Sequence, residues 1–302
     1  MDIRNRLKYL KELFLKVIVM KIGTIKSIWR YPVKGMSGER VQSCVFDAGG
    51  VKGDRIWTLQ DVQRQEIQNC KFRPQLLQCC ARSRRNIASG YVEITFPNGK
   101  RLRCDNPQAK AEVSALVGHY SVLQPLRPKT DDNFYRRYKT DEHTWLEELK
   151  ATFAREEGEP LPDLDNLPPS MQDFVPVLGT FFLVSLFHVL TTASLNHMKQ
   201  QNPESDWRVE RFRPNLVIDT LPGMTGLAEQ DWIGKVLKMG ELVIECSGPA
   251  PRCGAVTRKQ GGFGADASLL RSIVREAGQN LGIYGNIQSA GLIDVGDEVY
   301  LF

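Results

Sequence analysis

The sequence predicts a mainly β fold with some α, in which a few helices cover the strands. Short runs rich in β-branched and aromatic residues, bounded by glycine-rich or polar turns, follow one another from residue 22 to 126. An Asn98-Gly99 pair between two alternating runs indicates a tight hairpin. Strand-like apolar runs return after residue 215. A chain of 302 residues that is 42% hydrophobic can bury a substantial core, as one large domain or two smaller ones.

Residues 20–127 are predicted to form a β-rich domain, either a small barrel or a sandwich. Its expected strands lie at residues 22–33, 41–46 and 55–61 and on both sides of the hairpin turn in residues 91–103. The hairpin is the clearest element, because both residues of a two-residue turn must tolerate positive φ and Asn98-Gly99 does so.

Residues 1–19 are predicted to be an extension, either disordered or a basic amphipathic helix, since apolar residues recur at helical spacing among lysines and arginines. The apolar run in residues 13–20 is broken by Lys16 and falls short of the roughly 20 residues that a spanning helix needs. It also lacks the cleavage site of a signal peptide. Membrane contact is therefore not expected.

Residues 128–179 are charged and rich in proline, and we interpret them as a connector wrapped on the surface, with one helix around residues 144–156. Residues 180–302 are expected to form the second domain. Its expected elements are a helix at residues 185–200, strands at 215–219, 235–239 and 241–246, an amphipathic helix at 265–278, and a closing strand pair at 291–302. Asp266 is placed to cap or charge the start of the amphipathic helix.

The composition excludes several classes of function. A net charge of +5 permits a local anion site but falls short of a nucleic-acid-binding composition. The seven cysteines form an odd set without a CxxC pair or secretory signal, which favours a reducing cytoplasm over a disulfide framework. The four histidines show no zinc-site spacing.

Lys34 and Arg55 are the first candidate ligands. The segments YPVKGMSGE and GGVKGDRIW place them at strand ends beside glycines, where backbone N–H groups can also reach a ligand. Two cations with open backbone indicate an anion site. The alternative is that both are ordinary turn residues with solvated charges.

The segment ERFRPNLVID supplies the next candidates. Arg211 and Arg213 alternate with Phe212 and are expected to point the same way on an extended segment. Guanidinium groups bind phosphate through paired hydrogen bonds, which makes Arg213 the preferred phosphate ligand, with Asn215 at the same wall. The alternative is a surface salt bridge to a nearby acid, for which the candidates are Glu204, Asp206 and Glu210.

The loop GPAPRCGAVT, residues 248–257, carries the third candidate. Its prolines and glycines make a stiff loop that presents Cys253, and Arg252 adds positive charge that favours a thiolate. A presented thiolate is a nucleophile or a soft-metal ligand. The alternative, a buried apolar filler, is the interpretation for the remaining cysteines. These are Cys44, Cys70, Cys79, Cys80, Cys104 and Cys246.

Together and in this order, YPVKGMSGE, GDRIW, LTTASL, RFRPNLVID, APRCGAVT and VGDEVYLF resemble the MOSC-domain proteins that carry an N-terminal MOSC β-barrel domain. The resemblance spans about residues 22–302. It implies a β-barrel MOSC domain at residues 180–302, packed on a smaller β-rich N-terminal domain at residues 20–127. It also implies that molybdenum cofactor (Mo-molybdopterin) is held between the two domains.

The resemblance implies roles for single residues. Cys253 would bind the molybdenum and Arg252 would lie beside it, so these two are the expected catalytic residues. The other expected cofactor contacts are Lys34 and Arg55 from the N-terminal domain, Thr191, Thr192 or Ser194 from the LTTASL helix, and Arg213 and Asn215 at the pterin phosphate.

Three departures from the amidoxime-reducing relatives bear on substrate choice: Gly35 replaces a common serine, Pro251 precedes Arg252, and RKQGG replaces a DPxTG stretch. The leading hypothesis is a molybdenum-dependent oxidoreductase that reduces N-hydroxylated or N-oxygenated small molecules. Without a C-x₄-C-x₂-C ferredoxin module, electrons are expected from a separate flavin or iron–sulfur protein. The alternatives are a non-catalytic cofactor carrier or insertion factor and a metal-free sulfur carrier with a persulfide on Cys253.

Overall fold

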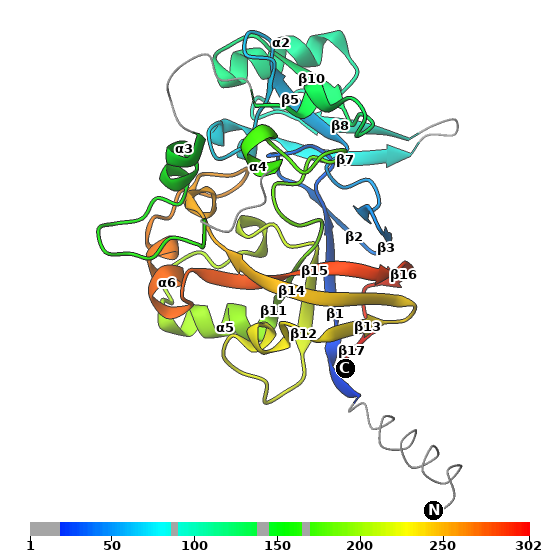
Figure 1. Ribbon diagram of the computed structural model, residues 1–302, viewed down its shortest axis with the longest axis vertical. Coiled ribbons are helices and arrows are strands. Elements are labelled where there is room, and N and C mark those ends of the chain that lie inside the picture. Colours follow the sequence, from blue (N-terminus) through cyan, green and yellow to red (C-terminus); the bar gives the residue numbers. More distant parts are fainter. Residues whose placement is uncertain (1–18, 86–89, 138–144, 165–169) are drawn as a thin grey trace, which may run out of the picture.

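The computed structural model describes residues 19–85, 90–137, 145–164 and 170–302, so the predicted extension lies outside it except for Val19. Figure 1 shows two β-rich lobes, one above the other, with helices on their surfaces. The prediction of a mainly β fold with covering helices is confirmed. Within the described ranges, no helix combines the length and the apolar character needed to cross a membrane. The domain bounds stay a prediction.

The lower lobe is a closed barrel. It is made from an eight-stranded sheet in which β1 pairs antiparallel with both β17 and β12, so that the sheet closes on itself. In sheet order the strands are β12 (Leu216–Thr220), β11 (His188–Thr191), β15 (Asn280–Ser289), β14 (Leu242–Pro251), β13 (Val236–Met239), β17 (Glu298–Leu301), β1 (Met20–Arg30) and β2 (Glu39–Val41). The first described strand therefore completes a barrel whose other closing strands lie in the second half of the chain.

The barrel interior is apolar. Ile22, Ile25 and Ile28 of β1 are fully buried and share one core with Leu237 of β13 and Ile244 of β14. Burial of each such side chain contributes about 1.5–3 kcal/mol relative to exposure. The core thus ties β1, and the loop that follows it, firmly to the second half of the chain.

Two helices, α5 (Thr192–Gln201) and α6 (Ser268–Glu276), cover the barrel in a separate apolar cluster. Asp266 accepts a hydrogen bond from the Leu269 amide at 3.3 Å, as predicted for the start of α6. The predicted helix over residues 185–200 is wrong in its first half, where β11 pairs with β12 and β15. The physical reason is that Val189 packs in the barrel core and Leu190 under the helices, so both faces of this segment are buried.

The upper lobe contains two small sheets, one of β10 (Ser121–Pro125), β5 (Trp57–Asp61) and β6 (Glu66–Ile67) and one of β7 (Cys80–Arg85), β8 (Gly90–Thr95) and β9 (Arg101–Arg103). A third small sheet, of β16 (Gly291–Asp294), β3 (Ser43–Asp47) and β4 (Gly50–Val51), packs on the barrel, because its Phe46 and Ile293 belong to the barrel core. The hairpin of β8 and β9 is confirmed, but only Gly99 has positive φ. The Phe96 amide donates to the Lys100 carbonyl at 2.9 Å, so the turn has three residues rather than two.

The helix α2 (Pro107–Val117) in this lobe was not predicted. It begins at Asn106, whose side chain accepts from the Gln108 amide, and Pro107 occupies its first turn. An asparagine cap followed by proline is a known signal for a helix start. Short 3-10 turns complete the chain: η1 (Pro74–Gln78), η2 (Asp132–Tyr135), η3 (Val209–Arg211), η4 (Ala228–Trp232) and η5 (Gly254–Thr257).

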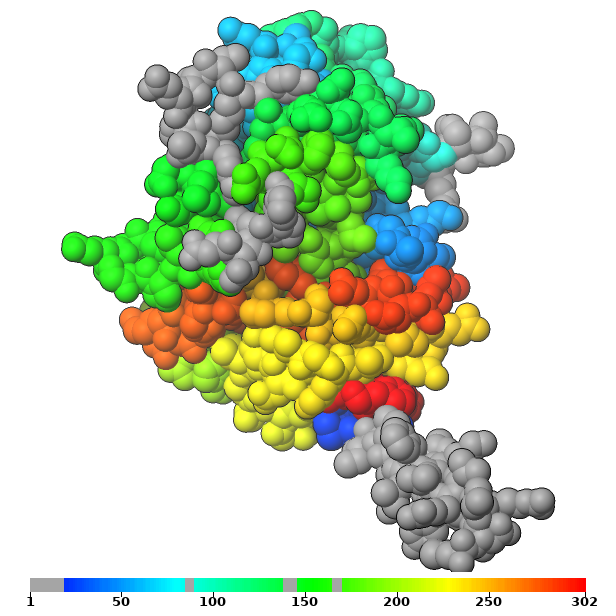
Figure 2. Space-filling model, viewed as in Figure 1, coloured from blue at the N-terminus to red at the C-terminus, as the bar shows by residue number. Residues whose placement is uncertain are grey.

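The connector lies across the seam between the lobes, as the green surface of Figure 2 shows. It holds α3 (Trp145–Thr152), within the helix predicted at residues 144–156, and α4 (Ser170–Asp173). It also buries side chains of its own, because Phe134, Tyr135 and Val175 cluster with Phe181. The connector is therefore part of the packed structure and not only a surface wrapping.

Candidate functional site

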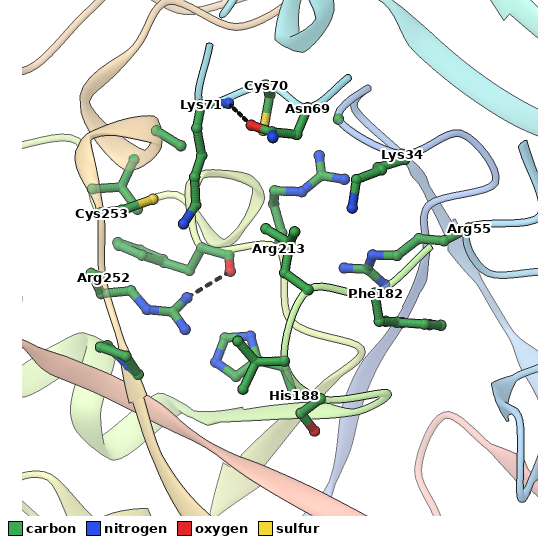
Figure 3. A pocket seen from close by; sticks show the side chains of 18 of the residues that line it. Lys34, Arg55, Asn69, Cys70, Lys71, Phe182, His188, Arg213, Arg252 and Cys253 are labelled. Carbon is green, nitrogen blue, oxygen red and sulfur yellow. Dashed lines mark hydrogen bonds between the residues drawn. The ribbon is translucent and has the colours of Figure 1, made fainter. Parts of the chain in front are cut away.

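A cavity of about 230 Å³ lies where the N-terminal residues, the connector and the barrel meet. Six of the predicted site residues line it: Lys34, Arg55, Arg213, Asn215, Arg252 and Cys253. Figure 3 shows the labelled cationic side chains around one shared space, with the Cys253 sulfur at its side. Within the described part of the chain, no aspartate or glutamate lines the cavity.

Lys34 follows β1, and its side chain is 5% exposed. Its Nζ donates to the Phe181 carbonyl at 2.6 Å. Burial lowers the pKa of Lys34 to about 7, and the nearby Arg55 cation lowers it as well. Gly35, with φ of +81°, turns the chain directly after it and packs its backbone against Cys70. A buried lysine that faces other cations stabilises an anion placed beside it.

Arg55 is held in place by Asp54, which lies behind the cavity. The two side chains form an ion pair, and Asp54 also accepts the Tyr31 amide at 2.6 Å. The guanidinium of Arg55 lies 4.6 Å from the centre of the Phe182 ring. Arg55 has φ of +49°, a left-handed conformation that is uncommon outside glycine. Such local backbone strain is found at ligand sites.

Asn215 lines the cavity, but its polar atoms are engaged within the protein. Its Nδ2 donates to Asp54 at 2.9 Å, and its Oδ1 accepts from the His188 amide at 3.2 Å. This residue therefore positions Asp54 and the start of β12. Its predicted contact with a phosphate is not tested by these bonds and stays a prediction.

Arg213 and Arg211 do not share an extended segment, and that prediction is wrong. Arg211 ends the 3-10 turn η3, and Arg213 has φ of +55°. Arg211 pairs with Asp206 at 2.9 Å, one of the acids named in the alternative, but its side chain is buried and lines the cavity, so the pair is not the predicted surface salt bridge. Arg213 instead donates to the Met36 carbonyl at 2.5 Å and lies 4.3 Å from the centre of the Tyr31 ring. Its charge is directed to the cavity.

Cys253 lies between the end of β14 and the start of η5, half-buried at the edge of the cavity. The neighbouring Arg252 is buried and donates to the carbonyls of Phe212 at 2.9 Å and Ala250 at 3.0 Å. Burial lowers the pKa of the Arg252 guanidinium. The loop therefore presents the Cys253 thiol next to a buried cation that hydrogen-bonds two backbone carbonyls and the Tyr284 side chain.

Thr191, Thr192 and Ser194 lie away from the cavity lining. Thr191 caps α5 by accepting the Ser194 amide at 3.1 Å, and both hydroxyls donate to the buried Glu229. The hydroxyl groups of Thr192 and Thr220 form a hydrogen bond at 3.3 Å. The structure does not bring these three residues to the other predicted ligands, because the Thr191 and Ser194 hydroxyls serve the start of α5 and the Thr192 hydroxyl bonds β12.

Comparison with known proteins places the chain in a family. Residues 22–129 match the MOSC N-terminal beta barrel domain, and residues 181–300 match the MOSC domain. The chain is a MOSC-domain protein. Mitochondrial amidoxime reducing component 2 of Bos taurus is 23% identical to it over 309 residues, with 93% of this chain and 84% of the relative covered. The protein of the same name from Homo sapiens is 22% identical over the same shares.

Among solved structures, the YuaD protein from Bacillus subtilis is similar to this MOSC protein with a TM-score of 0.41 and 12% identity. The match covers 94% of this chain and 96% of that chain. YiiM from Geobacillus stearothermophilus has a TM-score of 0.30 and 16% identity, with 39% of this chain and 54% of that chain covered.

Several lining residues of the MOSC protein were missed from the sequence. Cys70, interpreted as apolar filler, is half-buried and lines the cavity together with its neighbour Lys71. The other cysteines interpreted as filler, except the half-buried Cys80, are buried. Phe153 of the connector and His188 of β11 also line the cavity. A cysteine and a lysine after a short strand carry no periodic signal, so only the tertiary fold reveals them.

His188 is buried, and its Nε2 has no hydrogen-bond partner. Burial lowers the pKa of His188 well below its usual range, and the charge of Arg252 acts in the same direction. The imidazole is therefore neutral beside the cations of the cavity. Because it adds no charge, the positive potential there comes from the lysines and arginines.

Proposed function

We propose that the cavity binds molybdenum cofactor and that the protein is an oxidoreductase that reduces N-hydroxylated or N-oxygenated small molecules. The observation that carries the proposal is the combination, in a single cavity, of several buried cations with the half-buried thiol of Cys253, which directly follows Arg252; a second half-buried thiol, Cys70, lines the same cavity. Of the described residues that line it, Lys34, Arg213 and Arg252 donate to backbone carbonyls and form no ion pair with an acid. Buried charges without acidic partners are costly in free energy, so a site that keeps them favours an anionic ligand.

The residues present fit such a cofactor. Its phosphate is an anion, for which Arg213 and Lys34 supply hydrogen-bond donors and charge. Molybdenum bonds to soft sulfur ligands, for which Cys253 supplies the protein thiolate. Arg252, next in the chain, places positive charge beside that thiolate. When bound, the cofactor supplies a two-electron redox centre at the metal.

The remaining lining residues orient and enclose a ligand. Asp54 fixes Arg55, and Phe182 covers the face of its guanidinium, so that the cation keeps one orientation. Neutral His188 and the apolar side chains of Phe153, Phe181 and Phe182 would limit the access of water to the inner wall. Exclusion of water strengthens the attraction between the fixed cations and an anion.

The reaction class is inferred from the amidoxime reducing relatives, which align along most of the chain. Reduction of an N–OH group consumes two electrons and two protons and releases the oxygen as water. The electrons would come from a separate flavin or iron–sulfur protein, as we predict from the sequence.

The test is the molybdenum and pterin content of protein made in a host that synthesises the cofactor. We expect close to one molybdenum per chain in the wild type and a large loss in Cys253→Ser. Cys80→Ser is the matched control, because Cys80 is also half-buried but lies outside the cavity lining. Undiminished molybdenum and activity in Cys253→Ser would show that the ligand assignment is wrong.

Turnover separates the reductase from the two alternatives. With a chemical electron donor, the loaded wild type is expected to reduce members of a panel of N-oxygenated compounds. Bound molybdenum without any turnover identifies a cofactor carrier. A mass increase of about one sulfur atom on Cys253, without metal, identifies a sulfur carrier.

A further inference from the structure

The connector packs directly on the loop that presents Cys253. A side chain added at Gly254 would meet the Thr152 carbonyl and the Ala154 Cβ, each at 3.3 Å. The Arg155 guanidinium donates to the Arg252 carbonyl at 3.2 Å. Residues on both sides of Phe153 thus contact residues on both sides of Cys253. This arrangement sets Phe153 and Cys253 at matching positions on two packed segments.

The connector is fixed in this position by bonds to the barrel domain. Arg155 also donates to Gln279 Oε1 at 3.0 Å, and Gln279 Nε2 donates to the Leu161 carbonyl at 3.2 Å. Arg271 of α6 binds both the Ala154 carbonyl and the Glu159 carboxylate. With anchors on both sides, the segment holds Phe153 in one place.

Phe153 is 6% exposed and lines the cavity. The centre of its ring lies 5.2 Å from Nζ of Lys71, a residue of the N-terminal lobe, and 5.6 Å from the Arg155 guanidinium carbon. Cations within about 6 Å of an aromatic ring are attracted to its face. Phe153 therefore closes the cavity between the N-terminal lobe and the Cys253 loop, where Ala255 and Val256 continue an apolar lining.

The cavity consequently has two kinds of wall. One wall is cationic, with Lys34, Arg55 and Arg213, and suits the phosphate of a cofactor. The other wall, at the Cys253 loop, is aromatic and apolar, with Phe153, Ala255 and Val256, and Lys71 Nζ lies 5.2 Å from the centre of the Phe153 ring. A molecule that enters beside Cys253 meets the apolar wall.

We propose that Phe153 is a specificity-determining residue that selects substrates with an aromatic or flat apolar group next to the reducible N–O function. This inference rests on the proposed function, since it names the substrate class of the same site. Aromatic rings gain from edge or offset contacts with a phenylalanine beyond the burial of area. Loss of the ring is expected to reduce the preference for an aromatic over an aliphatic substrate roughly threefold to tenfold.

The first test needs no turnover. Full-length protein made without cofactor is reacted with N-phenylmaleimide and with N-methylmaleimide, and the rate of addition at Cys253 is followed by peptide mass spectrometry. Each rate is divided by that of the same reagent with glutathione. The wild type is expected to favour the phenyl reagent, and Phe153→Leu, which stays apolar, is expected to lose the preference.

Phe174→Ala is the matched control, because Phe174 is a half-buried phenylalanine of the same connector outside the cavity lining. Phe174→Ala is expected to show the same ratio of N-phenylmaleimide to N-methylmaleimide rates as the wild type. The proposal is overturned if Phe153→Leu leaves the ratio of the phenyl rate to the methyl rate unchanged. It is also overturned if Phe153→Ala raises both rates equally, because the ring would then only block access to Cys253.

The second test uses the loaded enzyme with an aromatic and an aliphatic amidoxime. Phe153→Leu is expected to lower the ratio of their kcat/KM values while molybdenum content stays at the wild-type level. An unchanged ratio with active enzyme overturns the specificity proposal alone. Absence of reduction by the wild type overturns the proposed function, and the maleimide ratio then still decides whether Phe153 recognises a ring.

Discussion

Asn215 donates its side-chain amide to the buried carboxylate of Asp54 at 2.9 Å. The two residues are 161 positions apart in the chain and join the loop before β5 to the start of β12. Asp54 in turn pairs with Arg55, a cation of the cavity. One hydrogen bond between distant segments therefore fixes the partner of a cation that lines the cavity.

Asn215→Ala is expected to lower the free energy of unfolding by about 1–3 kcal/mol, because it removes a donor from a buried carboxylate and an acceptor from the His188 amide. Urea titration followed by fluorescence measures the change. Gln288→Ala removes an exposed hydrogen bond to Glu245 and is expected to change stability by less than about 0.5 kcal/mol. Equal effects of the two substitutions would contradict the structural role of Asn215.

Much of the site was predictable because its residues stand in short motifs at strand ends. Lys34 follows β1, Arg213 precedes β12, and Cys253 follows β14. A closed barrel brings such ends together, so motifs far apart in the sequence converge on one cavity. The position of Phe153 at the cavity was not predictable, because it depends on how the connector packs on the Cys253 loop and not on a local pattern.

In the fold, too, some elements could be predicted from local sequence patterns and others could not. Alternating or apolar runs identified most barrel strands, whereas residues 185–191 show a helical apolar spacing although residues 188–191 form β11. Burial of this segment on both faces removes the alternation that distinguishes a strand. Thr191 caps the start of α5, which is a structural role for the LTTASL segment, and the predicted contact of this segment with cofactor stays a prediction.

Ser194→Ala is expected to destabilise the protein and leave its molybdenum content per folded chain unchanged. The substitution removes a hydroxyl donor from the buried Glu229, at a cost of about 1–3 kcal/mol. Elemental analysis of the folded fraction, together with thermal unfolding, measures both quantities. A selective loss of molybdenum at wild-type stability would return Ser194 to the set of cofactor contacts.

Gly282→Ala is expected to destabilise the barrel strongly. Gly282 has φ of +83°, and an added Cβ would lie 2.2 Å from His188 Nε2 and 2.6 Å from the Val189 carbonyl. Gly278→Ala is the matched control, since Gly278 has φ of +50° and nothing within 4 Å of an added Cβ. The control is expected to cost about 1 kcal/mol, from the backbone conformation alone, and Gly282→Ala distinctly more. Similar midpoints of urea unfolding would show that the space around Gly282 is not restrictive.

Lys34→Met is expected to change how stability depends on pH in the protein without cofactor. The folded-state pKa of Lys34 is lowered to about 7 from the usual 10.5, so between these values the unfolded chain binds a proton that the folded chain does not. Stability therefore gains about 1.4 kcal/mol per pH unit from Lys34 as pH rises through this window. Urea titrations from pH 6 to 9 are expected to show a smaller rise in Lys34→Met than in the wild type.

An anion bound in the cavity is expected to raise the pKa of Lys34 again, because it favours the charged form of the lysine. Binding of inorganic phosphate to the wild type is consequently expected to weaken as pH rises above about 7, as measured by calorimetry. Lys34→Met is expected to bind phosphate more weakly than the wild type at pH 6 and to show a smaller dependence on pH. Phosphate itself gains charge over this range, so the comparison of the two proteins at each pH isolates the lysine. If the phosphate affinities of the wild type and Lys34→Met were equal and changed with pH in the same way, the anion would bind away from Lys34.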